Sequence, residues 1–165
     1  MKKNKNNIAN ITNGTTGTII DLYPEWQVSE FDLKKIANET RLNEVFALCK
    51  DYYETEHYIF VHGWIPIIEN CYLYDKDWRN ARPERWNKTR WANPVDMFEY
   101  EIYEPNKTIV CGHWHCSALW HKAYPDKYEE FSDKENFEPF ITKQMIALDA
   151  CAAHTHKVNV VVIED

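Results

Sequence analysis

The sequence predicts an α/β domain, the class in which helices cover a β-sheet. Apolar residues recur at three- and four-residue spacing from Glu39 to Glu54, which is typical of an amphipathic helix. β-Branched runs at His57–Val61, Thr108–Cys111 and Lys157–Ile163 predict strands. Glycine and histidine follow the first two runs. Open α/β sheets place their ligands at the carboxyl ends of such strands, so we expect the site there.

Composition limits the function classes. The 165 residues suit one domain or a large part of one, and 44% of them are hydrophobic, which is enough for a core. The net charge of −7 argues against nucleic acid as the main partner, because phosphate backbones require a basic surface. The sequence contains neither an apolar run long enough for a membrane span nor a signal peptide. Five scattered cysteines indicate reduced thiols, so we expect a cytoplasmic protein without a membrane partner.

The remaining elements follow in chain order. Residues 1–16 are rich in Asn, Thr and Gly and predict a tail or loop, which leaves 17–165 as the folded portion. Ser29, followed by acidic residues, marks a helix start. The tryptophan-rich stretch from Ile65 to Pro94 has no periodicity and predicts an ordered, functional loop.

The second half alternates short elements with loops. We expect short helices at Pro94–Tyr103 and Ser117–Lys122, an acidic loop at Tyr124–Pro139, a strand at Gln144–Leu148 and a turn at Asp149–His156. In the last run, Lys157–Ile163, both alternating phases are largely apolar. This pattern predicts a strand covered on both faces.

Three histidines are the candidate metal ligands. His113 and His115 follow the strand Thr108–Cys111, and Gly112 between strand and histidines permits a sharp turn. His62 follows the strand His57–Val61, with its glycine, Gly63, after the histidine and not before it. Neutral imidazoles bind zinc, manganese and iron, so these three side chains could form a mononuclear site.

Two other enzyme classes fit less well. Phe60-Val-His-Gly-Trp64 is similar to an oxyanion segment of α/β-hydrolases, but no serine is flanked by glycines as a nucleophile elbow requires. His113-Trp-His115 is similar to a cupin metal motif, but a cupin requires many short strands and frequent turns. The helical pattern at Glu39–Glu54 and the scarcity of glycine oppose it.

The motifs together resemble one family. Tyr58-Ile-Phe-Val-His62-Gly63, Val110-Cys-Gly-His-Trp-His115 and Ile146-Ala-Leu-Asp149 look like the second half of the calcineurin-like metallophosphoesterases, closest to the serine/threonine-phosphatase-like members of bacteria and phages. The resemblance implies part of a four-layered α/β/β/α sandwich with a dinuclear centre of manganese, iron or zinc. His62 and His113 would ligate the second ion and His115 the first. Arg90, with Arg85 and Arg82 as reserve candidates, would bind the phosphate of a phosphorylated substrate.

The first-half motifs of the family are absent. The sequence contains no Asp-x-His, Gly-Asp-x-x-Asp-Arg-Gly or Gly-Asn-His-Asp/Glu, which supply the remaining ligands and the general acid in the family. The resemblance therefore implies a phosphoester hydrolase fragment that lacks its N-terminal half and is inactive alone, with an upstream-encoded half as partner. The alternative is a non-enzymatic module that holds one ion through His62, His113 and His115.

Overall fold

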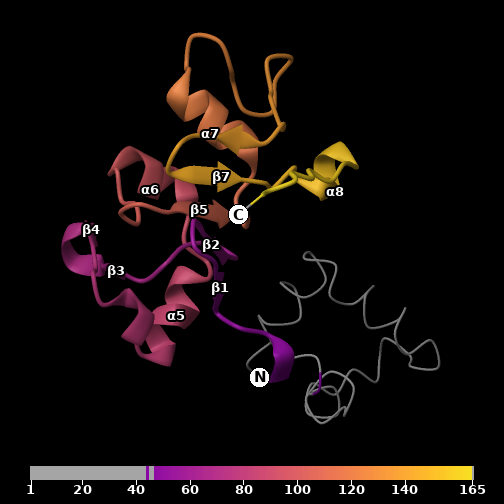
Figure 1. Cartoon of the computed structure of the whole chain (residues 1–165). Helices are drawn as coiled ribbons and strands as arrows, with labels where there is room; N and C mark the ends of the chain where they lie inside the picture. Colours follow the sequence, from indigo (N-terminus) through magenta and orange to yellow (C-terminus); the bar gives the residue numbers. More distant parts are fainter. Residues whose placement is uncertain (1–43, 45–46, 165) are drawn as a thin grey trace, which may run out of the picture. The chain divides into compact units, whose positions relative to one another are not determined.

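The computed structural model describes residue 44 and residues 47–164, which are coloured in Figure 1. Residues from Lys50 onward form one compact unit. The predicted tail at 1–16 and the helix start at Ser29 lie outside the described residues, as does most of the predicted helix Glu39–Glu54. At the end of that range, Tyr52–Glu54 forms the strand β1, so the helix prediction is wrong there.

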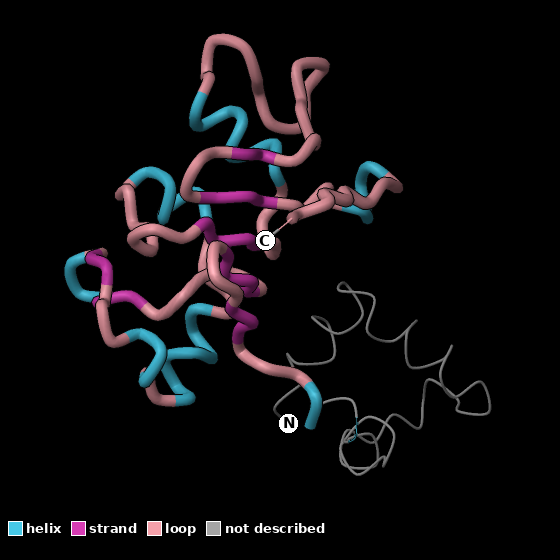
Figure 2. Tube along the Cα trace, in the orientation of Figure 1, coloured by secondary structure: helices cyan, strands magenta, loops and turns pink. Residues whose placement is uncertain are grey.

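A mixed sheet forms the centre of this unit (Figure 2). Its order is β1-β2-β5-β7-β6, in which β2 runs parallel to β5 and β5 parallel to β7, while β1 and β6 pair antiparallel at the two edges. The strands are β1 (Tyr52–Glu54), β2 (Tyr58–Val61), β5 (Thr108–Cys111), β6 (Phe140–Ile141) and β7 (Met145–Ala147). The predictions of β2, β5 and β7 are confirmed, and the chain has the mixed α/β content expected.

The Ile65–Pro94 stretch is more regular than its composition predicts. It contains a small hairpin of β3 (Ile67–Ile68) and β4 (Leu73–Tyr74), 3₁₀ turns η2 (Glu69–Cys71) and η3 (Trp78–Asn80), and helix α5 (Pro83–Thr89). Pro83 at the first helical position and Glu84 in the first turn explain where α5 begins.

Aromatic rings order this stretch. Trp78 and Trp86 are buried, and both contact Tyr52 of β1, at centroid distances of 4.9 and 5.2 Å. This packing attaches η3 and α5 to the edge strand. The prediction that the tryptophans order the segment is therefore confirmed, although its description as a loop was incomplete.

Two predicted helices are confirmed. Helix α6 (Pro94–Glu99) begins after Asn93, whose side chain accepts a hydrogen bond from the Val95 N–H, and α7 (Cys116–Ala123) follows β5. Phe140 of β6 contacts Phe98 of α6 and Trp120 of α7. The sheet and these two helices thereby share the core.

The C-terminal segment differs from its prediction. Residues 157–163 form no strand in the described part of the chain, and Val158, Val160 and Val162 are 80–87% exposed. Only the alternate residues Asn159, Val161 and Ile163 are partly buried. The prediction of a strand covered on both faces is wrong because a period-two apolar pattern does not specify a pairing partner. A short helix, α8 (Ala152–Thr155), precedes this segment where a turn was expected.

Candidate metal centre

The residues that follow the three parallel strands β2, β5 and β7 lie at one end of the sheet, where the carboxyl ends of these strands meet (Figure 1). Phe60 pairs with Val110, which pairs with Ile146, so the carboxyl ends of β2, β5 and β7 are level. The ladder continues beyond the strands, since the Gly112 N–H donates to the His62 carbonyl at 2.9 Å. His62, His113 and Asp149 are therefore delivered to the same edge, as the sequence predicts for the two histidines.

The imidazoles of His62 and His113 lie together. Their ring centroids are 5.1 Å apart, with an angle of 49° between the planes. The indole of Trp91, in the connection from α5 to α6, contacts both rings edge-on, at 5.6 Å from His62 and 5.2 Å from His113. The three rings form a partly open cluster, because Trp91 remains 64% exposed.

The backbone turn at this edge falls on a histidine. His113 has φ of 66°, a left-handed conformation that is uncommon for a side-chain-bearing residue, although histidine is among those that adopt it most readily. Strained backbone of this kind concentrates at functional sites. The turn expected at Gly112 is therefore made by its neighbour, and a Cβ added at Gly112 would meet only the His62 carbonyl oxygen, at an ordinary 3.7 Å.

A second glycine has a stricter role. A Cβ added at Gly63 would lie 2.6 Å from the Arg90 carbonyl oxygen and 2.7 Å from that of Thr89. The next residue, Trp64, donates its N–H to the same Thr89 carbonyl at 2.9 Å. Only glycine permits the end of α5 to pack this closely against the residue after His62. This contact places Trp91 beside the histidines.

The electrostatic environment favours neutral imidazole at His62. Burial lowers the pKa of His62, and the neighbouring His113 and the Arg90 guanidinium lower it further, while the Asp149 carboxylate opposes them. A metal ion binds the deprotonated ring nitrogen, so a lowered pKa reduces the competition from protons. The sequence motifs include Asp149 but assign it no role. Its position directly after the Gln144–Leu148 run was the available signal.

His115 faces other residues. Its ring stacks near Trp114 and contacts Phe131 and Phe137 at 4.9 and 5.8 Å, and its Nε2 lies 3.4 Å from a Glu130 oxygen. Burial lowers the pKa of His115, and Glu130 and Asp149 raise it. No ring contact joins His115 to His62 or His113 within the described residues. The structure thus brings two of the three predicted ligands together.

The two predicted phosphate-binding arginines are placed differently. Arg90 donates to Asp51 at 2.6 Å, is 42% exposed at its side chain, and lies close enough to His62 to affect its pKa. Arg85 donates to the Ile67 carbonyl and to Asp75, both at 2.7 Å, which attaches α5 to the β3–β4 hairpin. Arg90 is positioned near the histidine pair, whereas Arg85 has a structural contact.

The described residues supply only part of a metal coordination shell. Within residue 44 and residues 47–164, no group of three or more His, Cys, Asp or Glu side chains is arranged to hold an ion. Two adjacent imidazoles suit a transition metal, but they would need further ligands from water or another polypeptide segment. The buried Nδ1 atom of His115, which has no hydrogen-bond partner in the described part of the chain, is a third nitrogen at this end of the sheet.

Comparison with protein-family models, curated proteins and solved structures found no match for this chain. None of the helices in the described part of the chain has the length and apolar character that crossing a bilayer requires.

Proposed function

We propose that this chain is the C-terminal portion of a metal-dependent phosphoester hydrolase of the calcineurin-like type. The observation that supports it best is the convergence of His62 and His113, at 5.1 Å between ring centroids, on the level ends of parallel strands. The sequence resemblance assigns these same two residues to one metal ion. The proposal includes the cytoplasm as location and a four-layered sandwich as the fold of the complete protein.

In this proposal the predicted site residues have distinct roles. His62 and His113 bind one divalent ion, manganese, iron or zinc, and Arg90 binds the phosphate of a phosphorylated substrate. Arg90 would exchange its present ion pair with Asp51 for the phosphate, whose oxygens match a guanidinium bidentately. His115 would serve a second ion once the missing motifs supply its remaining ligands. When bound, two such ions stabilise the charge that develops during hydrolysis.

The chain alone should be inactive. Its sequence contains none of the three first-half motifs, so it lacks the bridging aspartate that they supply in the family to offset the repulsion between two divalent ions. We therefore propose that activity requires a polypeptide carrying Asp-x-His, Gly-Asp-x-x-Asp-Arg-Gly and Gly-Asn-His. No nucleic acid is needed in this scheme.

The test compares the chain alone with the chain plus such a polypeptide. We expect hydrolysis of an aryl phosphate with Mn²⁺ only in the complemented sample, and its loss on His113→Ala. His121→Gln is the matched control, because His121 lies in α7 and contacts the Tyr128 carbonyl through its Nδ1. Equal activity of His113→Ala and the unchanged protein would refute the site.

A second function is favoured by the incomplete donor set among the described residues. The chain would then be a non-enzymatic module that holds one ion through His62 and His113, with His115 as a further ligand. Metal stoichiometry discriminates between the two proposals. One ion per chain without hydrolysis in the complemented sample supports the module, and two ions per active assembly support the hydrolase.

A further inference from the structure

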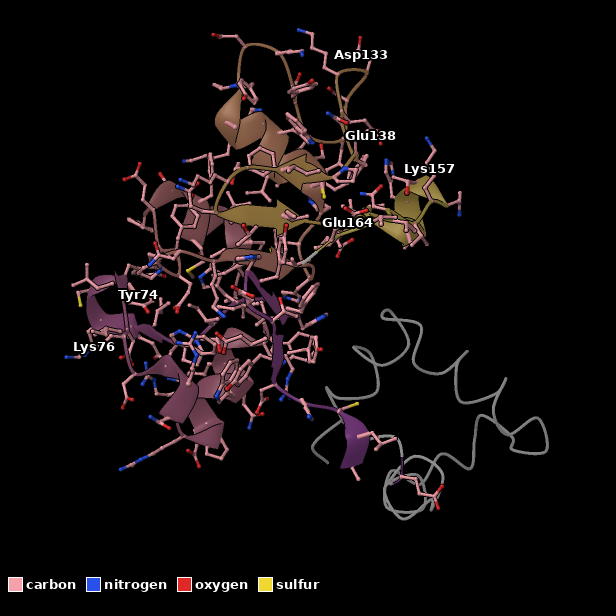
Figure 3. All side chains as sticks on the ribbon, viewed as in Figure 1. Tyr74, Lys76, Asp133, Glu138, Lys157 and Glu164 are labelled. Atoms are coloured by element: carbon pink, nitrogen blue, oxygen red, sulfur yellow. The ribbon has the colours of Figure 1, made fainter. Side chains whose placement is uncertain are left out.

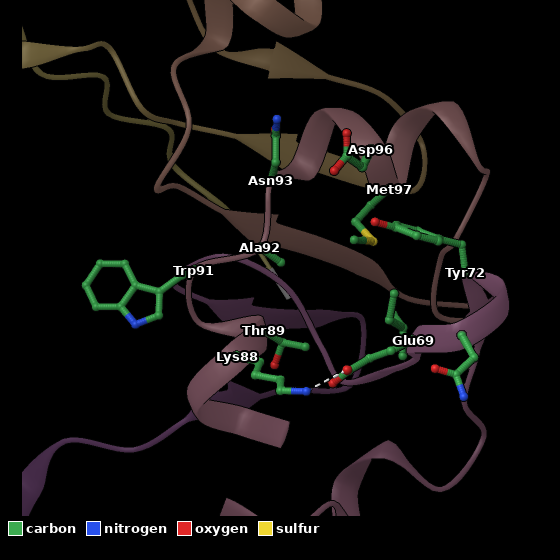
Figure 4. Close-up of a pocket in the computed structure, with 11 residues that line it drawn as sticks. Glu69, Tyr72, Lys88, Thr89, Trp91, Ala92, Asn93, Asp96 and Met97 are labelled. Carbon is green, nitrogen blue, oxygen red and sulfur yellow. Dashed lines mark hydrogen bonds and ion pairs between the residues drawn. The ribbon is translucent and has the colours of Figure 1, made fainter. Parts of the chain in front are cut away.

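A pocket of about 570 Å³ lies next to the histidine cluster, between the β3–β4 hairpin, the end of α5 and helix α6 (Figure 4). Ile67, Ala92 and Met97 form its apolar surface, and Ile67 and Met97 are buried. Trp91 belongs to the pocket and also to the histidine cluster. Figure 4 shows its ring directed away from the other lining residues. The pocket and the histidine pair are thus neighbours that share one side chain.

Among the described residues, one acid that lines the pocket has no ion-pair partner. The half-buried Asp96 has no hydrogen bond or ion pair through its carboxylate in the part of the chain that the structure describes. The other acid of the lining, Glu69, is already paired with Lys88 at 2.7 Å. A partly desolvated carboxylate without a partner is unfavourable and is relieved by a cationic ligand.

The aromatic rim fits a planar cation. Tyr72 is 42% exposed, and its ring lies 4.8 Å from that of Tyr100. Its backbone is left-handed, with φ of 48°, so the ring is held at the rim by a constrained turn. In Figure 4, Tyr72, Met97 and Asp96 lie on one side of the pocket, and Glu69 and Lys88 lie across from them. Guanidinium stacks on aromatic rings and binds carboxylates bidentately.

We propose that this pocket binds an arginine side chain of another polypeptide. The aliphatic stem would pack on Met97 and Ile67, and the guanidinium would reach Asp96 beside Tyr72. An anionic ligand would be repelled by Asp96, and a purely apolar one would desolvate the carboxylate without pairing it. That this arginine belongs to a phosphorylated substrate rests on the proposed function, but the binding itself does not.

The test is calorimetric or NMR titration of the 165-residue chain with a short unphosphorylated peptide that contains one arginine. We expect binding to weaken about fivefold or more when norleucine replaces arginine, or in Asp96→Asn. Asp96→Glu should restore part of the affinity. Asp133→Asn is the matched control, because Figure 3 shows the exposed Asp133 in the acidic loop after α7, apart from Tyr74 of the β3–β4 hairpin that borders the pocket.

Two outcomes would overturn the inference. In the first, Asp96→Asn has the same thermal midpoint as the unchanged chain and binds the arginine peptide equally well. In the second, the unchanged chain binds the arginine and norleucine peptides equally well. Phosphoserine versions of both peptides, with Mn²⁺, separate the two proposals. Phosphoserine-dependent binding that is lost in His113→Ala, with no preference for arginine, supports the metal site and refutes the pocket. Asp96-dependent binding to which phosphoserine adds nothing supports the pocket and argues against the hydrolase.

Discussion

The His62 and His113 rings lie 5.1 Å apart although they follow different strands. Their proximity depends on the parallel register of β2 and β5 and on the residues that follow each strand. Gly63 comes directly after His62, and Gly112 directly before His113. Both glycines are next to a histidine in the sequence, but the backbone of another segment packs much more closely on Gly63 than on Gly112. Substituting each glycine therefore tests this packing directly.

Gly63→Ala should be strongly destabilising. The new Cβ would lie within 2.7 Å of two backbone carbonyl oxygens at the end of α5, and backbone cannot move aside as a flexible side chain can. We expect a loss of about 2–3 kcal/mol in the free energy of unfolding, measured by urea denaturation. Gly112→Ala is the paired control and should change stability by less than about 1 kcal/mol, since its nearest contact would be 3.7 Å. Equal effects of both substitutions would contradict this account.

The sequence correctly predicted those elements that the residue pattern of a single short segment specifies. The β-branched runs of β2, β5 and β7 specify strands by themselves, and the strand ends then place His62 and His113. The Tyr52–Glu54 strand was mispredicted because Tyr52 and Tyr53 also continue a helical spacing. Trp91 was missed as a partner of the histidines. Its position depends on how α5 packs over Gly63, and such tertiary contacts leave no local signature in one sequence.

Glu54, on the partly buried face of β1, belongs to an ion-pair network that should make the fold sensitive to acid. Hydrogen bonding to Arg79, with a further contribution from Lys107, lowers the pKa of Glu54 to about 2. A depressed pKa stabilises the fold above the ordinary carboxyl pKa of about 4.3, and this stabilisation is lost as the pH falls toward 2. The partial exposure of Arg79, 34% at its side chain, reduces the effect to about 1–2 kcal/mol.

Glu54→Gln should therefore lower stability at neutral pH and flatten its decline in acid. Thermal unfolding between pH 7 and pH 3 measures both effects. The control is Glu138→Gln, an exposed acid whose carboxylate has no partner among the described residues (Figure 3). A pH profile of Glu54→Gln parallel to that of the unchanged chain would show that the pair contributes nothing.

The exposed valines of the C-terminal segment should promote self-association of the chain. Replacing them should reduce this association and leave the stability of the fold almost unchanged. Val158→Thr, Val160→Thr and Val162→Thr together should change the free energy of unfolding by less than about 1 kcal/mol, because these side chains are already 80% or more exposed. Sedimentation at increasing concentration should show less association of the triple variant, since an apolar stripe is removed. Val161→Thr, at a partly buried position, is the comparison and should cost about 1 kcal/mol. A large destabilisation by the triple variant would indicate that the valines are covered.

Replacing two neighbours of His62, Trp91 and Asp149, should shift the pKa of His62 in opposite directions. Burial is the largest contribution that lowers the pKa of His62, and Trp91 contacts its ring at 5.6 Å, so Trp91→Ala should raise that pKa toward its ordinary value. The Asp149 carboxylate raises the same pKa, so Asp149→Asn should lower it further. The asparagine retains an oxygen to accept the Cys151 N–H, which Asp149 now accepts at 2.8 Å.

NMR titration of the His62 ring protons in the metal-free protein measures these shifts. Tyr124→Ala is the control for Trp91→Ala, because Tyr124 is an exposed aromatic residue that packs on Trp120 rather than on the histidines. Shifts of the same sign in Trp91→Ala and Asp149→Asn would contradict the arrangement. The expected pattern would establish that Asp149 and Trp91 have opposite effects on the pKa of His62. Asp149 favours the protonated ring, and Trp91 favours the neutral ring that a metal ion binds.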